Sequence, residues 1–367
     1  MFKSRSGTSL FSFGSSTWSD LSSGFYVFLL ALPLSLGIAE ASGFPAVMGL
    51  LTATIGGVLT SWFTGSKLSI KGPAAGLIVI VFGAVQDLGG NNPINGWMHV
   101  LLAIFVASII QIILGLLKLG KWVDLIPPSA IKGMLAAIGV VIFSKQIYIL
   151  LGIPATDLAG NSISKPLPLL ANLVSNLKFI NWKVAAIGVW SFSWVWIWTK
   201  VKSPVLKAIP SPLIVLVSVI PIAYYLEIDS IYRLRFGFEF SQIWNLKIAF
   251  VSPVSWWVFI KYVGLFAIIG SLESLLTVNA IHGLKPGVVP NKDKDLISIG
   301  IGNMVASLFG GLPMISEVAR SSANIDNGAK THWSNVFHGL FVFLFMVFSS
   351  YFNELIPIQP SNLKQKE

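Results

Sequence analysis

The sequence predicts an all-helical integral membrane protein with about eleven transmembrane segments. Three observations support this fold class. Of the 367 residues, 54% are hydrophobic and 11% are charged, whereas soluble domains carry about 25% charged residues. The apolar residues form long runs, and two of these runs begin at glycine–proline breaks. A soluble chain of this length has too little interior to bury so much apolar surface, so the lipid bilayer is the expected environment.

Eleven apolar stretches approach or reach the roughly 20 residues that a helix needs to cross a bilayer. They lie at residues 21–42, 45–65, 70–88, 97–117, 129–151, 183–199, 209–226, 254–281, 295–311, 313–328 and 332–356. Residues 1–20 and 358–367 form polar tails. The third and the tenth stretches are short, and both begin at breaks that contain glycine and proline.

The basic residues favour an orientation with the N-terminus in the cytoplasm. The net charge is +10, but the lysines stand singly between apolar spans and form no basic stripe, so no nucleic acid partner is expected. With the N-terminus inside, the inner loops contain Lys67, Lys71, Lys118 and Lys285, as the positive-inside rule requires. We expect a multi-pass protein of the cytoplasmic membrane.

Several classes of chemistry lack the residues that they need. The absence of cysteine excludes disulfides, thiolate metal sites and cysteine nucleophiles. No spacing indicates a nucleotide loop, a catalytic triad or a metal cluster. We therefore expect neither an enzyme nor a bound metal or cofactor.

The first break runs from Ser69 to Gly76 and contains Gly72 and Pro73. Proline is favoured at the beginning of a helix and disfavoured inside one. The apolar residues that follow, 77–85, are too few to cross a bilayer alone. These features predict an extended segment that enters the membrane and a helix that begins near its middle.

The second break repeats this pattern at Gly310, Gly311 and Pro313. A helix is expected to begin at the proline, where the preceding span has just ended. Two interrupted segments in corresponding positions of two halves indicate a transporter binding site, although two ordinary proline kinks are the alternative. Backbone N–H groups and the positive end of each helix dipole would attract an anion. The predicted binding residues are Gly72, Pro73, Ala74, Ala75, Gly76, Pro313, Met314, Ile315, Ser316 and Arg320.

Charged residues inside the spans are the next candidates. Glu273 lies well within the eighth span, where a charge is costly, and with Thr277 it is predicted to couple transport to a proton or another cation. A hydrogen-bonded structural carboxylate is the alternative. Arg320, expected about two turns after the beginning of its helix, would provide a positive field for the anion. It could instead pair with Glu317, three residues earlier on the same helix face.

Three further residues are weaker candidates. Glu317 would repel an anion if it pointed inward, so we expect its side chain to turn away or to be neutralised. Asn303 is expected to form hydrogen bonds between helices rather than to bind a ligand. Glu40 could line the cavity or pair with another helix.

Several motifs resemble the sulfate permease (SulP, solute carrier 26) family. They are the runs from Asp20 to Gly43, Ser69 to Gly76, Lys145 to Ile147 and Gly270 to Leu276, and the long run from Gly300 to Gly328. Their order matches the first, third, fifth, eighth, ninth and tenth helices of that family. The resemblance extends over residues 20–357.

The resemblance implies fourteen segments in two inverted repeats, with an anion held between the third and tenth half-helices. A core domain would comprise residues 21–128 and 254–357, and half of a gate domain residues 129–253. Relatives move sulfate, bicarbonate or chloride, often with a proton or sodium ion, and usually as dimers. The core would move relative to the gate as an elevator.

The sequence departs from the family pattern in three ways. After about the eleventh segment the pattern ends, so we expect a chain without the last three gate segments and the family's cytoplasmic STAS domain. Ala74 and Ala75 stand where many relatives have a hydroxyl group, and Glu40 adds a carboxylate. Two interpretations therefore stay open: a secondary transporter of small inorganic anions, and a partial or inactive product or one part of a split transporter. A channel of the same fold and a nucleobase carrier are further alternatives.

Overall fold

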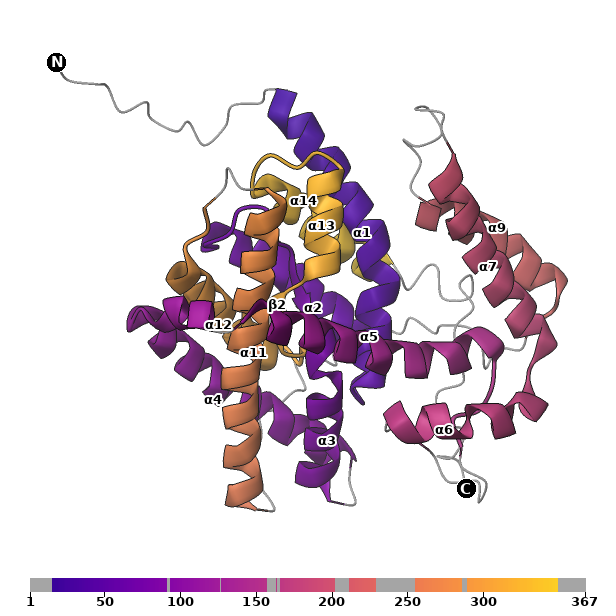
Figure 1. The fold of residues 1–367 in the computed structure, drawn as a ribbon, viewed down its shortest axis with the longest axis horizontal. Coiled ribbons are helices and arrows are strands. Elements are labelled where there is room, and N and C mark those ends of the chain that lie inside the picture. The colour runs from indigo at the N-terminus through magenta and orange to yellow at the C-terminus, as the bar shows by residue number, and fades with distance from the viewer. Residues whose placement is uncertain are drawn as a thin grey trace.

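A computed structural model shows how these segments are arranged (Figure 1). It describes residues 15–90, 93–125, 127–156, 163, 166–201, 211–228, 255–285 and 289–348. Each of the eleven predicted spans overlaps a helix in this part of the chain, and residues 209–210, 254 and 349–356 of these spans lie outside the described residues. The prediction of a helical protein is therefore confirmed at the level of its segments.

Helices from the two ends of the chain form one packed group. Its elements are α1 (Ser15–Ala41), α2 (Ala46–Val58), η1 (Thr60–Trp62), β1 (Lys71–Pro73), η2 (Ala75–Leu77), α3 (Ile78–Gly89), α4 (Pro93–Leu116), η3 (Leu119–Leu125), α11 (Trp256–Leu284), α12 (Lys292–Leu308), β2 (Met314–Ser316), α13 (Val318–Asp326) and α14 (Trp333–Phe348). Helix α4 packs along α12 and α11, while α14 packs along α1 and α2. The largest cluster of buried apolar side chains lies among these helices.

The middle of the chain forms a second group, with α6, α7 and α9 to one side of Figure 1. Its elements are α5 (Pro128–Leu151), α6 (Pro166–Asn176), η4 (Leu177–Phe179), α7 (Trp182–Lys200) and α9 (Ser211–Tyr225). These helices pack mainly on one another. One contact with the first group is the hydrogen bond that Lys145 Nζ of α5 donates to the Ala41 carbonyl at the end of α1, at 2.8 Å.

Helix α6 was not predicted, because its 11 residues are too few to be recognised as a membrane span. Other boundaries follow from local sequence. Asn181 and Asn291 cap α7 and α12 by accepting backbone N–H bonds. Gly152 ends α5 in the left-handed conformation, at φ +62°, which glycine adopts without a steric penalty.

Among the described residues, three helical segments are long and apolar enough to cross a membrane by themselves. They are Ser16–Ala41, Gly96–Leu116 and Trp256–Leu284. Helices α3 and α13 have 12 and 9 residues, so each covers only part of a bilayer at 1.5 Å per residue. Both breaks therefore lead into a short helix, as the sequence predicts.

The two breaks meet in a short antiparallel sheet. Strand β1 pairs with β2 so that Lys71 lies opposite Ser316 and Pro73 opposite Met314. The pairing continues at both ends: Ala74 N donates to the Pro313 carbonyl, and Glu317 N to the Ile70 carbonyl, each at 2.9 Å. The two prolines that interrupt the spans are thus neighbours.

One expectation about the second break is wrong. We expected the helix to begin at Pro313, but α13 begins at Val318. Residues 314–316 are extended because their backbone groups pair with β1 and with side chains of α11 and α12. Arg320 consequently lies in the first turn of α13, not two turns into it.

Candidate functional site

The two helix beginnings flank the β1–β2 strand pair. Because the strands are antiparallel and each leads into a helix, α3 and α13 leave the strand pair in opposite directions, α13 upward and α3 downward in Figure 1. Their positive N-terminal ends therefore face the same short stretch of sheet. Residues of both strands are buried, whereas Ala75 and Gly76 are partly exposed and Ala319 is exposed.

The amides at the beginning of η2 have acceptors within the protein. Ala74 N donates to the Pro313 carbonyl, as described above. Ala75 N donates to Glu317 Oε1 at 3.3 Å, and the amide of Gly76 interacts with the Glu273 carboxylate. Two carboxylates therefore stand where we expected the amides to be free for an anion.

Of the two expectations for Glu317, the side chain does not turn away from the site, and its pair with Arg320 agrees with the other, that its charge is neutralised. Glu317 is the N-cap residue of α13, yet its side chain accepts no hydrogen bond from that helix and instead contacts the other break. Glu317 is buried, with 7% of its surface exposed. The physical reason is that the Ala75 N–H and the Arg320 charge are both within reach of the carboxylate and attract it.

Arg320 is completely buried. Its guanidinium lies against Gly72, where an added Cβ would require the Nη1 end of the arginine to shift. The Nε atom is 3.8 Å from Glu317 Oε2, which is an ion pair but longer than a hydrogen bond. Both alternatives from the sequence, a pair with Glu317 and a field for an anion, are compatible with this position.

Helix α11 contributes another buried carboxylate near the breaks. Glu273 is 5% exposed, and Thr277, one turn further along, is 3% exposed. Between them, Ser274 Oγ accepts a hydrogen bond from Ser316 N at 2.9 Å, so α11 contacts both breaks. Glu40 is half-buried in the last turn of α1.

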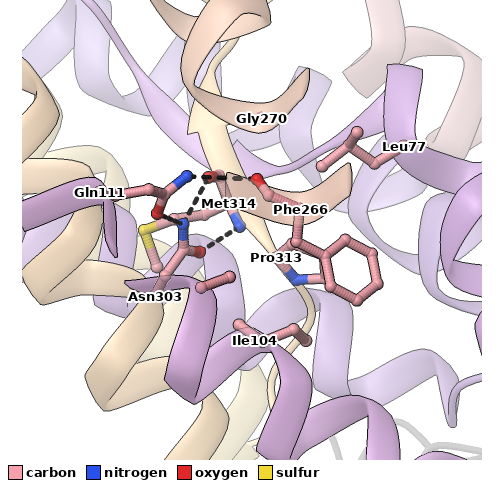
Figure 2. Close-up of a pocket in the computed structure, with 9 residues that line it drawn as sticks. Leu77, Ile104, Gln111, Phe266, Gly270, Asn303, Pro313 and Met314 are labelled. Atoms are coloured by element: carbon pink, nitrogen blue, oxygen red, sulfur yellow. Dashed lines mark hydrogen bonds between the residues drawn. The ribbon is translucent and has the colours of Figure 1, made fainter. Parts of the chain in front are cut away.

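A small pocket lies beside the second break (Figure 2). Asn303 of α12 holds both backbone groups of Met314: its Oδ1 accepts from Met314 N at 2.6 Å, and its Nδ2 donates to the Met314 carbonyl at 3.2 Å. Asn303 Nδ2 also donates to Gln111 Oε1 at 2.9 Å. The lining residues are Leu77, Ile104, Ala107, Gln111, Phe266, Gly270, Asn303, Pro313 and Met314. Of these, sequence reasoning had named Asn303, Pro313 and Met314; Gln111, an amide within an apolar span, was the signal that it missed.

A second charged cluster was not predicted. Lys71 Nζ donates to Asp295 Oδ1 at 2.8 Å and to Thr64 Oγ1 at 2.7 Å, and Ser316 Oγ donates to Asp295 Oδ2 at 3.3 Å. Both charged side chains are fully buried. We had counted Lys71 as an inner-loop lysine, which is wrong, because it lies in β1 and its charge is neutralised by Asp295 from α12.

Comparisons with known proteins agree with this arrangement. A model of the "Sulfate permease family" matches residues 17–359. YvdB of Bacillus subtilis, named as a candidate sulfate transporter, is 30% identical over 344 residues, which cover 90% of this chain and 60% of YvdB. The bicarbonate transporter BicA of Picosynechococcus is 26% identical over 92% of this chain and 59% of BicA. The chain thus spans about 60% of the length of these relatives.

Solved structures show the same fold. The transmembrane domain of a cyanobacterial BicA superposes with a TM-score of 0.78 at 24% identity, covering 94% of this chain and 85% of that one. SLC26A9 superposes with a TM-score of 0.73 at 17% identity, over 95% of this chain and 56% of its own. The predicted fold class, a helical membrane protein with two half-helices at its third and tenth segments, is confirmed.

Proposed function

Because the chain belongs to the sulfate permease family, we propose that it carries small inorganic anions such as sulfate or bicarbonate across a membrane by secondary active transport. The observation that carries the proposal is the β1–β2 pairing, which places the N-terminal ends of α3 and α13 beside the buried Arg320. Irregular backbone within a membrane protein is tolerated where it lines a protein-enclosed cavity. Named relatives include transporters of sulfate and of bicarbonate, which supports these two substrates.

In the proposed mechanism, backbone amides and one side chain bind the anion together. Amides at the beginning of η2 would donate hydrogen bonds to the anion, aided by the dipole of α3. Arg320 would contribute the positive charge from the first turn of α13. Gly72 allows the guanidinium to approach the backbone, and the anion would enter past the exposed Ala319.

Glu273 and Thr277 are the proposed coupling residues. A carboxylate buried beside the Gly76 amide becomes more stable when it gains a proton or a metal cation, and this gain would offset the charge of an arriving anion. We further propose that residues 21–128 and 254–357 move as a core relative to residues 129–253. A homodimer in the cytoplasmic membrane, with the N-terminus cytoplasmic, completes the proposal.

The test is uptake of radiolabelled sulfate and bicarbonate into proteoliposomes that contain this chain alone. Uptake that rises with an inward proton or sodium gradient supports the proposal, and Glu273→Gln is expected to remove the dependence on the gradient. Arg320→Ala should lower uptake of either anion at least tenfold. Absence of uptake by the wild-type chain, in vesicles where it is folded, would contradict transport by this chain and favour one part of a split transporter.

A further inference from the structure

The Glu317 carboxylate contacts both groups that the proposed function assigns to the anion, the Ala75 amide N–H and the Arg320 guanidinium. Its Oε1 accepts a hydrogen bond from Ala75 N at 3.3 Å, and its Oε2 is 3.8 Å from Arg320 Nε. An oxyanion bound by these groups would place its own oxygen atoms in the same positions. Glu317 is therefore a chemical likeness of the anion, attached to the protein.

The contacts of Arg320 show that Glu317 satisfies it only in part. A guanidinium has five N–H donors, yet Nε, Nη1 and Nη2 make no hydrogen bond within the described part of the chain, although the residue is fully buried. Burying a charge without hydrogen bonds is costly. Arg320 therefore retains capacity for an acceptor that approaches more closely than Glu317.

Other charged groups around Glu317 do not take over this role. Glu273 from α11 repels it electrostatically and contacts the Gly76 amide. Lys71 of β1 is held by Asp295 of α12, and the buried His338 of α14 lies near Arg320 but offers no negative charge. Within this set, Glu317 is the carboxylate that contacts both Ala75 and Arg320.

We propose that Glu317 is a tethered competitor of the transported anion. Its carboxylate binds the Ala75 amide and Arg320 when no anion is present, and an arriving anion must displace it. The tether lowers the affinity for the anion. It also speeds release of the anion, because the Glu317 carboxylate takes the place of the departing anion as hydrogen-bond acceptor. This inference rests on the proposed function and extends it by naming a residue that sets affinity.

The experiment is calorimetric titration of the detergent-solubilised chain with sulfate and, separately, with bicarbonate. Glu317→Gln keeps the size of the side chain and one acceptor oxygen but removes the competing charge, so its Kd should fall about tenfold, which is about 1.4 kcal/mol. Glu317→Ala, which removes the side chain beyond Cβ, should bind at least as tightly as Glu317→Gln. Asp326→Asn is the matched control: it removes the same charge from an exposed position on α13 and should change Kd less than twofold.

The outcomes separate this inference from the proposed function. Tighter binding by both Glu317 variants, or binding by them alone, supports the tethered competitor. If the wild type binds and both variants bind equally or more weakly, Glu317 is a structural cap and the inference is wrong, while the anion site stands. If wild type and variants, each shown to be folded by its melting temperature, all fail to bind either anion, the proposed function fails and the inference fails with it.

Discussion

The two breaks have the same shape but different chemistry. The first, from Lys71 through α3, contributes backbone amides and leads into an apolar helix, Ile78–Gly89. The second, from Met314 through α13, contributes side chains: Glu317 and Arg320 at its beginning, and the buried Ser321 and Asn324 further along. One half-helix thus supplies hydrogen-bond donors fixed in the backbone, and the other supplies charge.

This difference indicates that the two breaks depend on different supports. The first is held by close backbone packing, because a Cβ at Gly56 of α2 would collide with the Lys71 carbonyl. The second is held by hydrogen bonds from Asn303 and Ser274. The Lys71–Asp295 pair joins them, since Asp295 contacts both Lys71 of β1 and Ser316 of β2.

The largest loss of stability is expected from a substitution in the Lys71–Asp295 pair, which joins the two breaks. Asp295→Ala leaves the Lys71 charge buried and unpaired, which should lower the free energy of unfolding by about 3–5 kcal/mol. The melting temperature in detergent, followed by tryptophan fluorescence, is the measurement. Lys261→Ala, which breaks the half-exposed pair with Asp87, is the control and should cost less than about 1 kcal/mol. Equal losses in the two variants would contradict a joining role.

A smaller loss of stability is expected when only the hydrogen bonds that hold the second break are removed. Asn303→Ala removes the partner of the N–H and the carbonyl of Met314, which should lower the free energy of unfolding by about 2–3 kcal/mol in total. The same melting measurement checks this prediction. Asn327→Ala removes an amide that bonds only within its own helix turn, to the Ala323 carbonyl, and should destabilise less. A neutral Asn303→Ala would show that β2 is held by β1 without help from α12.

The smallest effect is expected from crowding the first break. Gly56→Ala must separate α2 from β1, which should cost about 1–3 kcal/mol. Gly133→Ala in α5 is the matched control, because nothing lies within 4 Å of its added Cβ. It should stabilise its helix by up to about 1 kcal/mol. The two substitutions are thus expected to change the melting temperature in opposite directions, and a shift in the same direction would contradict close packing at Gly56.

The sequence predicts the spans and both breaks, but it does not predict the short strands. Apolar runs locate the spans, and the glycines and prolines locate both breaks, because a membrane helix tolerates such interruptions only in special surroundings. The three-residue strands were not predicted, since segments that short show no periodicity. Their pairing depends on residues more than 200 positions apart.

The site was predicted less completely than the fold. Sequence reasoning named Arg320 and Glu317 and weighed a pair between them, but it could not tell that Glu317 reaches across to Ala75. The direction of a side chain at a helix beginning depends on where the helix begins, and the strand at residues 314–316 moved that point to Val318. The same shift brought Arg320 over Gly72.

The central claim is that an anion binds between the Ala75 amide and the Arg320 guanidinium. The most direct measurement is anomalous diffraction from crystals that contain selenate, an analogue of sulfate whose selenium atom can be located without bias. We predict a selenium peak with oxygen atoms within hydrogen-bonding distance of both groups, and a Glu317 side chain displaced from Ala75. A peak in the pocket beside Asn303, or elsewhere with Glu317 still bound to Ala75, would contradict the claim.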